Sequence, residues 1–318
     1  MKKKPNPIQQ IIDTYKSVIL DGAIATEIEK KGININDSLW SAKAIIDNPA
    51  AIKEVHVEYF AAGSDVATTN TYQANIDGFI QKGYTKEEAE RLLEDTALAA
   101  IEARNSFWGA LSESEKETRP FPLVAGSIGP YGAFLADGSE YTGDYSLTDQ
   151  AFESFHLPRM KLLEEAKCDV FAFETIPSFK ESIALANMLK NYFPSMTAWL
   201  SFSIRDGSHL SDGTPLSEAA AFFNSFSNIS AIGVNCTAAV NIKEVLDTLK
   251  IATDKPLIVY PNAGGVYDGS TKMWTEEEKN NNFGEMTKCW HEDGAVLIGG
   301  CCRTTPEHIR QIANWARD

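Results

Sequence analysis

Three of the five cysteines in this chain stand at the ends of apolar runs. Cys236 ends the stretch Gly233-Val234-Asn235-Cys236, and two adjacent cysteines end the stretch Gly299-Gly300-Cys301-Cys302. Neighbouring residues on a regular strand point to opposite faces, so Cys301 and Cys302 can bind one ion only where the chain has left the strand. The two preceding glycines permit such a turn. The sequence therefore predicts that three sulfurs converge on one metal ion.

Three thiolates with an open fourth position are typical of catalytic zinc, because sulfur ligands suit zinc and structural zinc sites close with four protein ligands. A zinc hydrolase or aldolase is disfavoured, since those enzymes bind zinc largely through histidine. Two other interpretations stay open. Any one of the cysteines can be a small buried apolar residue, and the barrel can be a non-catalytic zinc-binding protein. A disulfide between Cys301 and Cys302 is disfavoured in a chain without a secretion signal.

The remaining cysteines and the nearest histidine are interpreted as structural. Cys168 precedes a predicted strand and Cys289 lies on a predicted helix, so we expect both in the core or at the opposite end of the fold. His308 is expected in the first turn of a helix that begins with Thr305 as cap and Pro306. That place predicts a solvent-facing histidine and not a ligand.

Short apolar runs alternate with amphipathic helical patterns along the whole chain. Strand and helix in alternation indicate a parallel sheet, and eight such units predict a (β/α)₈ barrel, an α/β fold of the TIM type, as a single domain over residues 1–318. The predicted strands are 18–20, 65–69, 122–126, 169–173, 197–202, 231–235, 257–260 and 295–298. The predicted helices are 49–62, 86–104, 149–166, 179–191, 216–225, 242–253 and 276–292.

Two long insertions follow predicted strands, at the barrel end where such enzymes build their sites. The first spans residues 21–48, and the second spans residues 129–145, which we call the lid. The lid carries glycines, acids and four aromatic residues. Those aromatics can hold a cation against their rings or simply pack under a loop, and they are Tyr131, Phe134, Tyr141 and Tyr145.

Composition excludes several classes of partner. The formal charge of −15 repels phosphate backbones and anionic surfaces, so nucleic acid is not an expected partner. Neither a signal peptide nor an apolar membrane span is visible, which predicts a cytoplasmic protein that does not bind membranes. With 43% hydrophobic and 23% charged residues, the chain can bury a sizeable core.

At this point the sequence resembles the homocysteine S-methyltransferase family over nearly its whole length. The resemblance begins at Asp21-Gly22-Ala23-Ile24-Ala25-Thr26-Glu27 and includes both cysteine motifs, which the wider family shares. The lid motifs are similar to those of the branch that uses S-methylmethionine, namely Gly126-Ser127-Ile128-Gly129-Pro130-Tyr131-Gly132-Ala133 and Leu135-Ala136-Asp137-Gly138-Ser139-Glu140-Tyr141.

The resemblance implies a set of site residues. Cys236, Cys301 and Cys302 become the ligands of Zn²⁺, and Asp21 and Glu174 bind the amino group of homocysteine. From the residues alone, Asp21 is equally a turn cap and Glu174 equally half of an ion pair. The resemblance also implies substrate contacts for the backbone near Gly22 and Ala23 and for the side chains of Thr69 and Asn235.

The methyl donor is expected to be a sulfonium. The betaine-using branch has a tyrosine directly after the acid of the fourth strand, whereas this chain has Thr175 and lacks that branch's long C-terminal extension. The expected reaction is zinc-dependent methyl transfer from S-methylmethionine, or from S-adenosylmethionine, to the zinc-bound thiolate of L-homocysteine, giving methionine. The alternatives are a betaine-homocysteine methyltransferase and a non-catalytic zinc-binding barrel.

Overall fold

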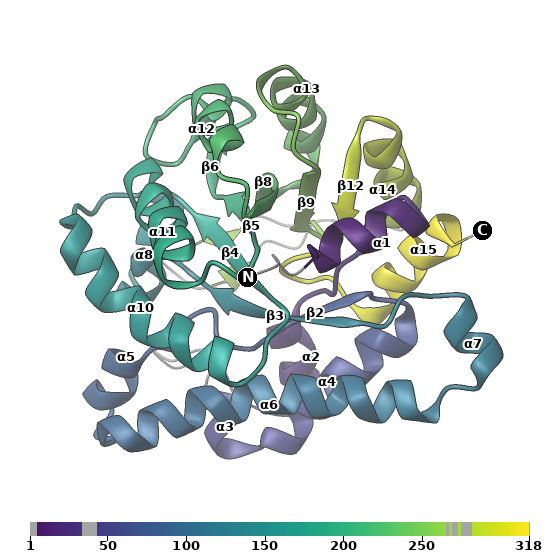
Figure 1. Ribbon diagram of the computed structural model, residues 1–318, viewed down its shortest axis with the longest axis horizontal. Helices are drawn as coiled ribbons and strands as arrows, with labels where there is room; N and C mark the ends of the chain where they lie inside the picture. Colours follow the sequence, from purple (N-terminus) through teal and green to yellow (C-terminus); the bar gives the residue numbers. More distant parts are fainter. Residues whose placement is uncertain (1–4, 34–42, 265–266, 269–272, 275–281, 318) are drawn as a thin grey trace.

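A parallel barrel forms the centre of the molecule. The computed structural model describes residues 5–33, 43–264, 267–268, 273–274 and 282–317. Among these, eight strands make one sheet in the order β1-β12-β9-β8-β5-β4-β3-β2, and every recorded pairing in it is parallel. The sheet curls into a nearly closed barrel with helices around it (Figure 1). The predicted (β/α)₈ architecture is confirmed.

All eight predicted strands are present, and several extend further toward their carboxyl ends. Their bounds are β1 Val18–Ile19, β2 Val66–Thr68, β3 Leu123–Ile128, β4 Val170–Ile176, β5 Ala198–Phe202, β8 Ile229–Ala238, β9 Leu257–Asn262 and β12 Ala295–Ile298. The extensions of β4 and β8 matter most for function, because they carry Glu174 and Cys236.

Backbone and side-chain hydrogen bonds join β1 to β2, where the sheet closes. The Asp65 N–H donates to the Ile19 carbonyl over 2.7 Å, and the Ile19 N–H donates to the Asp65 carboxylate over 2.8 Å. At the other end of the same seam, the Thr68 N–H donates to the Asp21 carboxylate over 2.7 Å. Asp21 therefore ties the two strands together at the carboxyl end of the barrel.

Helices surround the barrel and begin where their sequences predict. Asn48 caps α4 by accepting from the Ala51 N–H, and Gly63 ends it with a φ of 114°. The helices that follow or flank the strands are α2 Ile24–Lys30, α4 Pro49–Ala62, α6 Lys86–Ala110, α10 Asp149–Glu165, α11 Phe179–Tyr192, α12 Leu216–Phe222, α13 Ile242–Ala252, α14 Phe283–Glu292 and α15 Pro306–Ala316. The predicted start of α14, at residues 276–281, lies outside the described residues.

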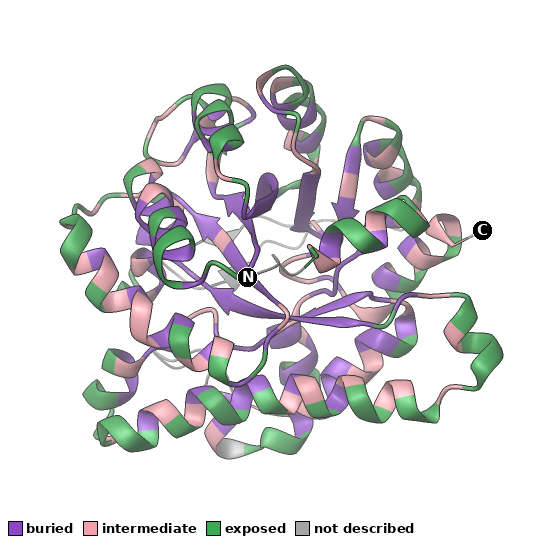
Figure 2. Ribbon diagram, in the orientation of Figure 1, coloured by how far each residue is buried: buried purple, intermediate pink, exposed green. Residues whose placement is uncertain are grey.

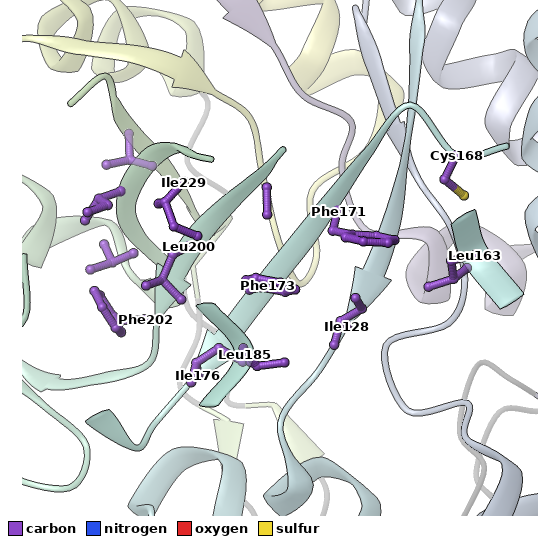
Figure 3. Close-up of a cluster of buried hydrophobic side chains, with 14 of the residues drawn as sticks. Ile128, Leu163, Cys168, Phe171, Phe173, Ile176, Leu185, Leu200, Phe202 and Ile229 are labelled. Carbon is purple, nitrogen blue, oxygen red and sulfur yellow. The ribbon is translucent and has the colours of Figure 1, made fainter. Parts of the chain in front are cut away.

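The core has two layers separated by the sheet. Inside the barrel, Val18, Ala172 and Leu297 pack with Ile8 and Ile11 of α1 (Pro7–Tyr15), which crosses the amino end of the barrel (Figure 1). Outside it, the helices cover the other face of each strand, as Figure 3 shows for the buried phenylalanines of β4. Burial is concentrated in the strands and on the inner helix faces (Figure 2).

Several elements were not expected from the sequence. The lid contains two short helices, α8 Tyr131–Leu135 and α9 Ser139–Thr142. Small hairpins follow two strands, β6 Ile204–Asp206 with β7 His209–Leu210, and β10 Tyr267–Asp268 with β11 Met273–Trp274. Further short helices are α3 Lys43–Asp47, α5 Ile76–Gln81 and α7 Glu113–Glu117. No helix in the described part of the chain is long and apolar enough to cross a membrane.

Candidate metal centre

The three predicted cysteines lie together at the carboxyl end of the barrel. The sulfurs of Cys236, Cys301 and Cys302 all lie within 4.8 Å of one another, and the Cys236 and Cys302 sulfurs are 3.7 Å apart. Sulfurs bound to zinc at about 2.3 Å in a tetrahedron lie about 3.8 Å apart. The cluster therefore fits a zinc ion, and three sulfurs leave one tetrahedral position for another ligand.

Backbone contacts set the position of each cysteine. Cys236 adopts a left-handed conformation with φ of 52°, which turns its side chain out of the ordinary alternation of β8. The Cys301 N–H donates to the Pro261 carbonyl over 2.8 Å, and the Cys302 carbonyl accepts from the Ala263 N–H over 3.0 Å. The pair is thus fixed to the end of β9.

The two glycines before the cysteine pair act through size and not through an unusual φ. A Cβ at Gly300 would lie 2.3 Å from the Thr304 methyl group, and one at Gly299 would lie 2.6 Å from the Leu20 side chain. The left-handed residue of this turn is Arg303, with φ of 65°. The glycines thus permit the turn because a side chain at either position would collide with Leu20 or Thr304, and not because either glycine has a positive φ.

The sulfur cluster concentrates negative charge. Hydrogen bonds from the Cys301 and Cys302 thiols hold the pKa of Cys236 well below its usual range. The same contacts raise the pKa of Cys301 and of Cys302 well above that range. The three sulfurs thus share protons and negative charge, and a divalent cation bound among them would stabilise all three as thiolates.

Asp21 lies beside this cluster with its carboxylate engaged by the next strand. Its two oxygens accept from the Thr68 N–H over 2.7 Å and from the Thr68 hydroxyl over 2.5 Å. Burial raises the pKa of Asp21 to about 7 against the effect of these bonds, and the nearby Glu174 carboxylate raises it further. A cation placed between the two acids would stabilise both in the charged form.

Glu174 is held by hydroxyl groups from two other strands of the barrel. Its carboxylate accepts a hydrogen bond from Ser127 of β3 and one of 3.2 Å from the Tyr260 hydroxyl of β9. Tyr260 in turn accepts from the Trp199 indole N–H over 3.1 Å. Burial raises the pKa of Glu174 to about 7, against these two hydrogen bonds and with a contribution from the charge of Cys236.

Asn235 positions the residue after Glu174. Its side-chain oxygen accepts from the Thr175 N–H over 2.7 Å and from the Ser201 hydroxyl over 2.8 Å, while its amide donates to the Thr175 hydroxyl over 2.8 Å. Thr175 has φ of 57°, a strained conformation for a β-branched residue. Asn235 therefore stabilises the backbone turn that presents Glu174, in addition to preceding Cys236.

The other residues implied for substrate binding have protein partners in this structure. The Ala23 N–H donates to the Thr304 hydroxyl over 3.1 Å, and a Cβ at Gly22 would lie 2.7 Å from that same oxygen. The Thr69 hydroxyl accepts from the Ser127 N–H over 2.9 Å and lies 2.7 Å from the Thr71 hydroxyl. Their contact with a substrate carboxylate stays a prediction.

Of the lid aromatics named above, Tyr141 contacts the sulfur cluster directly. Its hydroxyl lies 3.5 Å from the Cys236 sulfur. Tyr131 and Phe134 pack against Phe155 of α10, with ring centroids 5.0 and 5.5 Å from it. The Tyr145 hydroxyl donates to the buried Glu181 carboxylate. Packing therefore accounts for three of these rings and leaves Tyr141 facing the cluster.

The remaining sequence interpretations have mixed outcomes. Cys168 is buried, as expected, whereas Cys289 is exposed on α14. The prediction that His308 faces solvent is wrong. It is half-buried, accepts from the Thr305 N–H through Nδ1 over 3.1 Å and meets the Phe283 ring edge-on. A histidine cap at this position takes the place of the usual glutamate.

Sequence reasoning missed the residues that support the two acids. Ser127 was visible only as part of a lid motif, and Tyr260 only as the end of a predicted strand. Thr304 was missed as well, although it donates to the Cys301 carbonyl over 2.6 Å and accepts from Ala23. A hydroxyl residue at the carboxyl end of a barrel strand was the available signal.

Comparisons with known proteins agree with this site. The sequence model of the homocysteine S-methyltransferase family matches residues 18–316. Homocysteine S-methyltransferase YbgG of Bacillus subtilis is 51% identical over 312 residues, covering 98% of each chain. Homocysteine S-methyltransferase of Escherichia coli is 44% identical, covering 96% of this chain and 97% of that one.

A solved structure shares the fold. The metallated form of the homocysteine methyltransferase MmuM from Escherichia coli superposes with a TM-score of 0.87 at 41% identity, covering 98% of this chain and all of the other. The family match, the relatives and the barrel with its strand-end cysteines lead to one conclusion. The chain belongs to the homocysteine S-methyltransferase family and is an enzyme that transfers a methyl group to homocysteine.

Proposed function

We propose that this enzyme binds Zn²⁺ through Cys236, Cys301 and Cys302 and methylates homocysteine with a sulfonium donor, S-methylmethionine before S-adenosylmethionine. The observation that carries the proposal is the sulfur cluster, whose spacing suits zinc and which lies beside two acids with raised pKa. Zinc bound there would lower the pKa of an incoming thiol and make it a thiolate at neutral pH.

The two acids are proposed to orient homocysteine. An ammonium group between Asp21 and Glu174 would donate charge-assisted hydrogen bonds to both carboxylates and offset the repulsion between them. Ser127 and Tyr260 fix the Glu174 carboxylate, and Asn235 fixes the turn beside it. With its amino acid end held at two points, homocysteine can direct its sulfur toward the cysteines.

The chemical step moves one methyl group and cancels charge. The homocysteine thiolate forms a bond to the methyl carbon, the bond from that carbon to the donor sulfur breaks, and its electron pair stays on the donor sulfur. S-methylmethionine and homocysteine thus give two molecules of methionine, and the thiol proton goes to solvent. Because a negative and a positive sulfur become two neutral thioethers, a site without water favours the reaction. Tyr141 on the lid lies where it can exclude water from the Cys236 sulfur.

A betaine donor is the alternative that the sequence left open. Betaine lacks an amino group, so its quaternary ammonium must be enclosed by the pocket alone. In this chain Thr175, buried and bonded twice to Asn235, follows the fourth-strand acid where the betaine branch has a tyrosine. Those contacts support a sulfonium donor. A non-catalytic role for the metal is disfavoured because three sulfurs leave a position open for a thiol.

Removal of one cysteine tests the metal site. We expect Cys302→Ala to lose zinc and methyl transfer together while the barrel stays folded, since the core does not depend on a metal at the strand ends. Cys289→Ala, which removes an exposed thiol, is the matched control and should keep both. Zinc per chain, methionine formed and the circular dichroism spectrum are measured on each protein. Full turnover with stoichiometric zinc in Cys302→Ala would refute the assignment.

A further inference from the structure

Glu140 on the lid helix α9 has a buried carboxylate oxygen to which no group of the described residues donates a hydrogen bond. The residue is 8% exposed, and its Oε2 atom is buried without a hydrogen-bond partner among the described residues. Two other interior acids near the site have donors: Glu174 accepts from Ser127 and Tyr260, and Glu181 accepts from the Tyr131 N–H. Asp65 at the opposite end of the barrel also has one oxygen without a donor, but its other oxygen is paired with Arg317. A buried acceptor without a donor is costly, so folding alone does not explain Glu140.

Glu140 lies on the lid helix that meets the sulfur cluster, and the charge of Cys236 contributes, after burial, to raising its pKa. The next residue, Tyr141, places its hydroxyl 3.5 Å from the Cys236 sulfur. Burial is the main cause that raises the pKa of Tyr72, and smaller contributions come from the charges of Glu140, Cys236 and Glu174. Tyr72 therefore lies near both Glu140 of the lid and Glu174 of β4. The Tyr72 hydroxyl is buried as well. Glu140 thus belongs to the lid side of the sulfur cluster, while Asp21 and Glu174 lie at the strand ends.

The chemistry of the donor decides which cation suits this acid. S-methylmethionine carries two positive groups, the sulfonium that reacts and the α-ammonium that does not. A carboxylate against the sulfonium would stabilise the ground state more than the transition state, because that charge disappears as the methyl group moves, and it would slow the reaction. A carboxylate against the ammonium keeps its full attraction throughout and improves binding without this penalty.

We propose that Glu140 binds the α-ammonium group of the methyl donor and thereby makes the enzyme selective for sulfonium donors that carry an amino acid end. This inference rests on the proposed function, since it assumes a sulfonium donor. Different carboxylates then bind the ammonium groups of the two substrates. Asp21 and Glu174 bind that of homocysteine, and Glu140 binds that of the methyl donor. On this proposal the Glu140 Oε2 atom has no protein partner among the described residues because its partner is a substrate.

Paired donors and one isosteric variant test the proposal. Dimethylsulfoniopropionate has a dimethylsulfonium and a carboxylate, as S-methylmethionine does, but lacks the carbon that carries the amino group. In Glu140→Gln we expect KM for S-methylmethionine to rise about 10- to 100-fold, the effect of losing one charge-assisted hydrogen bond, with kcat changed less than about 3-fold. The kcat/KM for dimethylsulfoniopropionate should change less than about 3-fold. Calorimetric titration of the zinc-loaded variant with S-methylmethionine should show the same loss of affinity.

Asp137→Asn is the matched control. Asp137 stands three residues before Glu140 on the lid, is exposed and accepts from the Ser139 N–H, so the variant removes one negative charge from the lid outside the proposed site. Asp137→Asn should leave kcat/KM unchanged for both S-methylmethionine and dimethylsulfoniopropionate. Equal losses for the two donors in Glu140→Gln, or an unchanged KM for S-methylmethionine, would overturn the inference and leave the proposed function standing. A wild-type enzyme that does not use S-methylmethionine would overturn both. Zinc content and KM for homocysteine should equal those of the wild type.

Discussion

At the scale of single residues, the site depends on conformations that side chains far away in the sequence maintain. Thr175 and Cys236 both have positive φ, and each stands next to a residue proposed for function. Asn235 accounts for the first of these, with two hydrogen bonds to Thr175 across 60 positions. Strained backbone of this kind persists only where surrounding contacts enforce it.

Glu174→Gln tests how homocysteine is held. The amide keeps the shape of the side chain but loses the charge proposed to bind the ammonium, so we expect KM for homocysteine to rise about 10-fold or more. Zinc content should not change, because Glu174 does not belong to the sulfur cluster. Steady-state kinetics with homocysteine as the varied substrate measure the effect. An unchanged KM would contradict the assignment.

The raised pKa values predict how homocysteine binding depends on pH. Burial raises the pKa of Asp21 and of Glu174 to about 7 in the free enzyme, so both are increasingly protonated below that pH. A protonated acid does not attract an ammonium, and kcat/KM for homocysteine should therefore fall as pH drops through about 7. In Glu174→Gln the fall should be shallower. Zinc content is measured at each pH, because thiolate ligands also release metal in acid.

At the scale of elements, the lid is anchored by a buried network between α10 and α11. Glu181 accepts from the Tyr131 N–H and His156 Nε2, each over 2.7 Å, and from the Tyr145 hydroxyl. Arg159 donates to His156 Nδ1 over 3.1 Å, which fixes the histidine as a neutral ring with its proton on Nε2. One carboxylate thus holds both ends of the lid and keeps Tyr141 near the cluster.

Tyr145→Phe tests this anchor. Removing the hydroxyl leaves an oxygen of buried Glu181 without its donor, which should lower the free energy of unfolding by about 1–3 kcal/mol. The loosened lid should also raise KM for the methyl donor. Tyr192→Phe removes an exposed hydroxyl that donates to Glu153 over 2.6 Å and should cost less than about 0.5 kcal/mol. Denaturant unfolding and donor kinetics compare the two. If the two variants lost the same free energy of unfolding and had the same KM for the donor, Tyr145 would not anchor the lid through Glu181.

At the scale of the whole molecule, local sequence patterns predicted the barrel and the converging cysteines. Strand and helix periodicities are local, and parallel strand ends meet at one face whatever the details of the turns. The supports of the site could not be predicted the same way. Tyr260 reaches Glu174 across 86 positions, and Glu140 is buried on α9, which packs against α8 and β4. Such contacts arise from tertiary packing, which periodicity does not encode.

A sulfonium donor that methylates homocysteine at a three-cysteine zinc site implies a definite order among possible donors. The most direct measurement is kcat/KM of zinc-loaded enzyme with homocysteine and S-methylmethionine, S-adenosylmethionine or betaine, followed by methionine formation. We predict S-methylmethionine first, S-adenosylmethionine second and betaine last, because the ranking reflects differential binding of the transition state. Faster turnover with betaine under the same conditions would contradict the account.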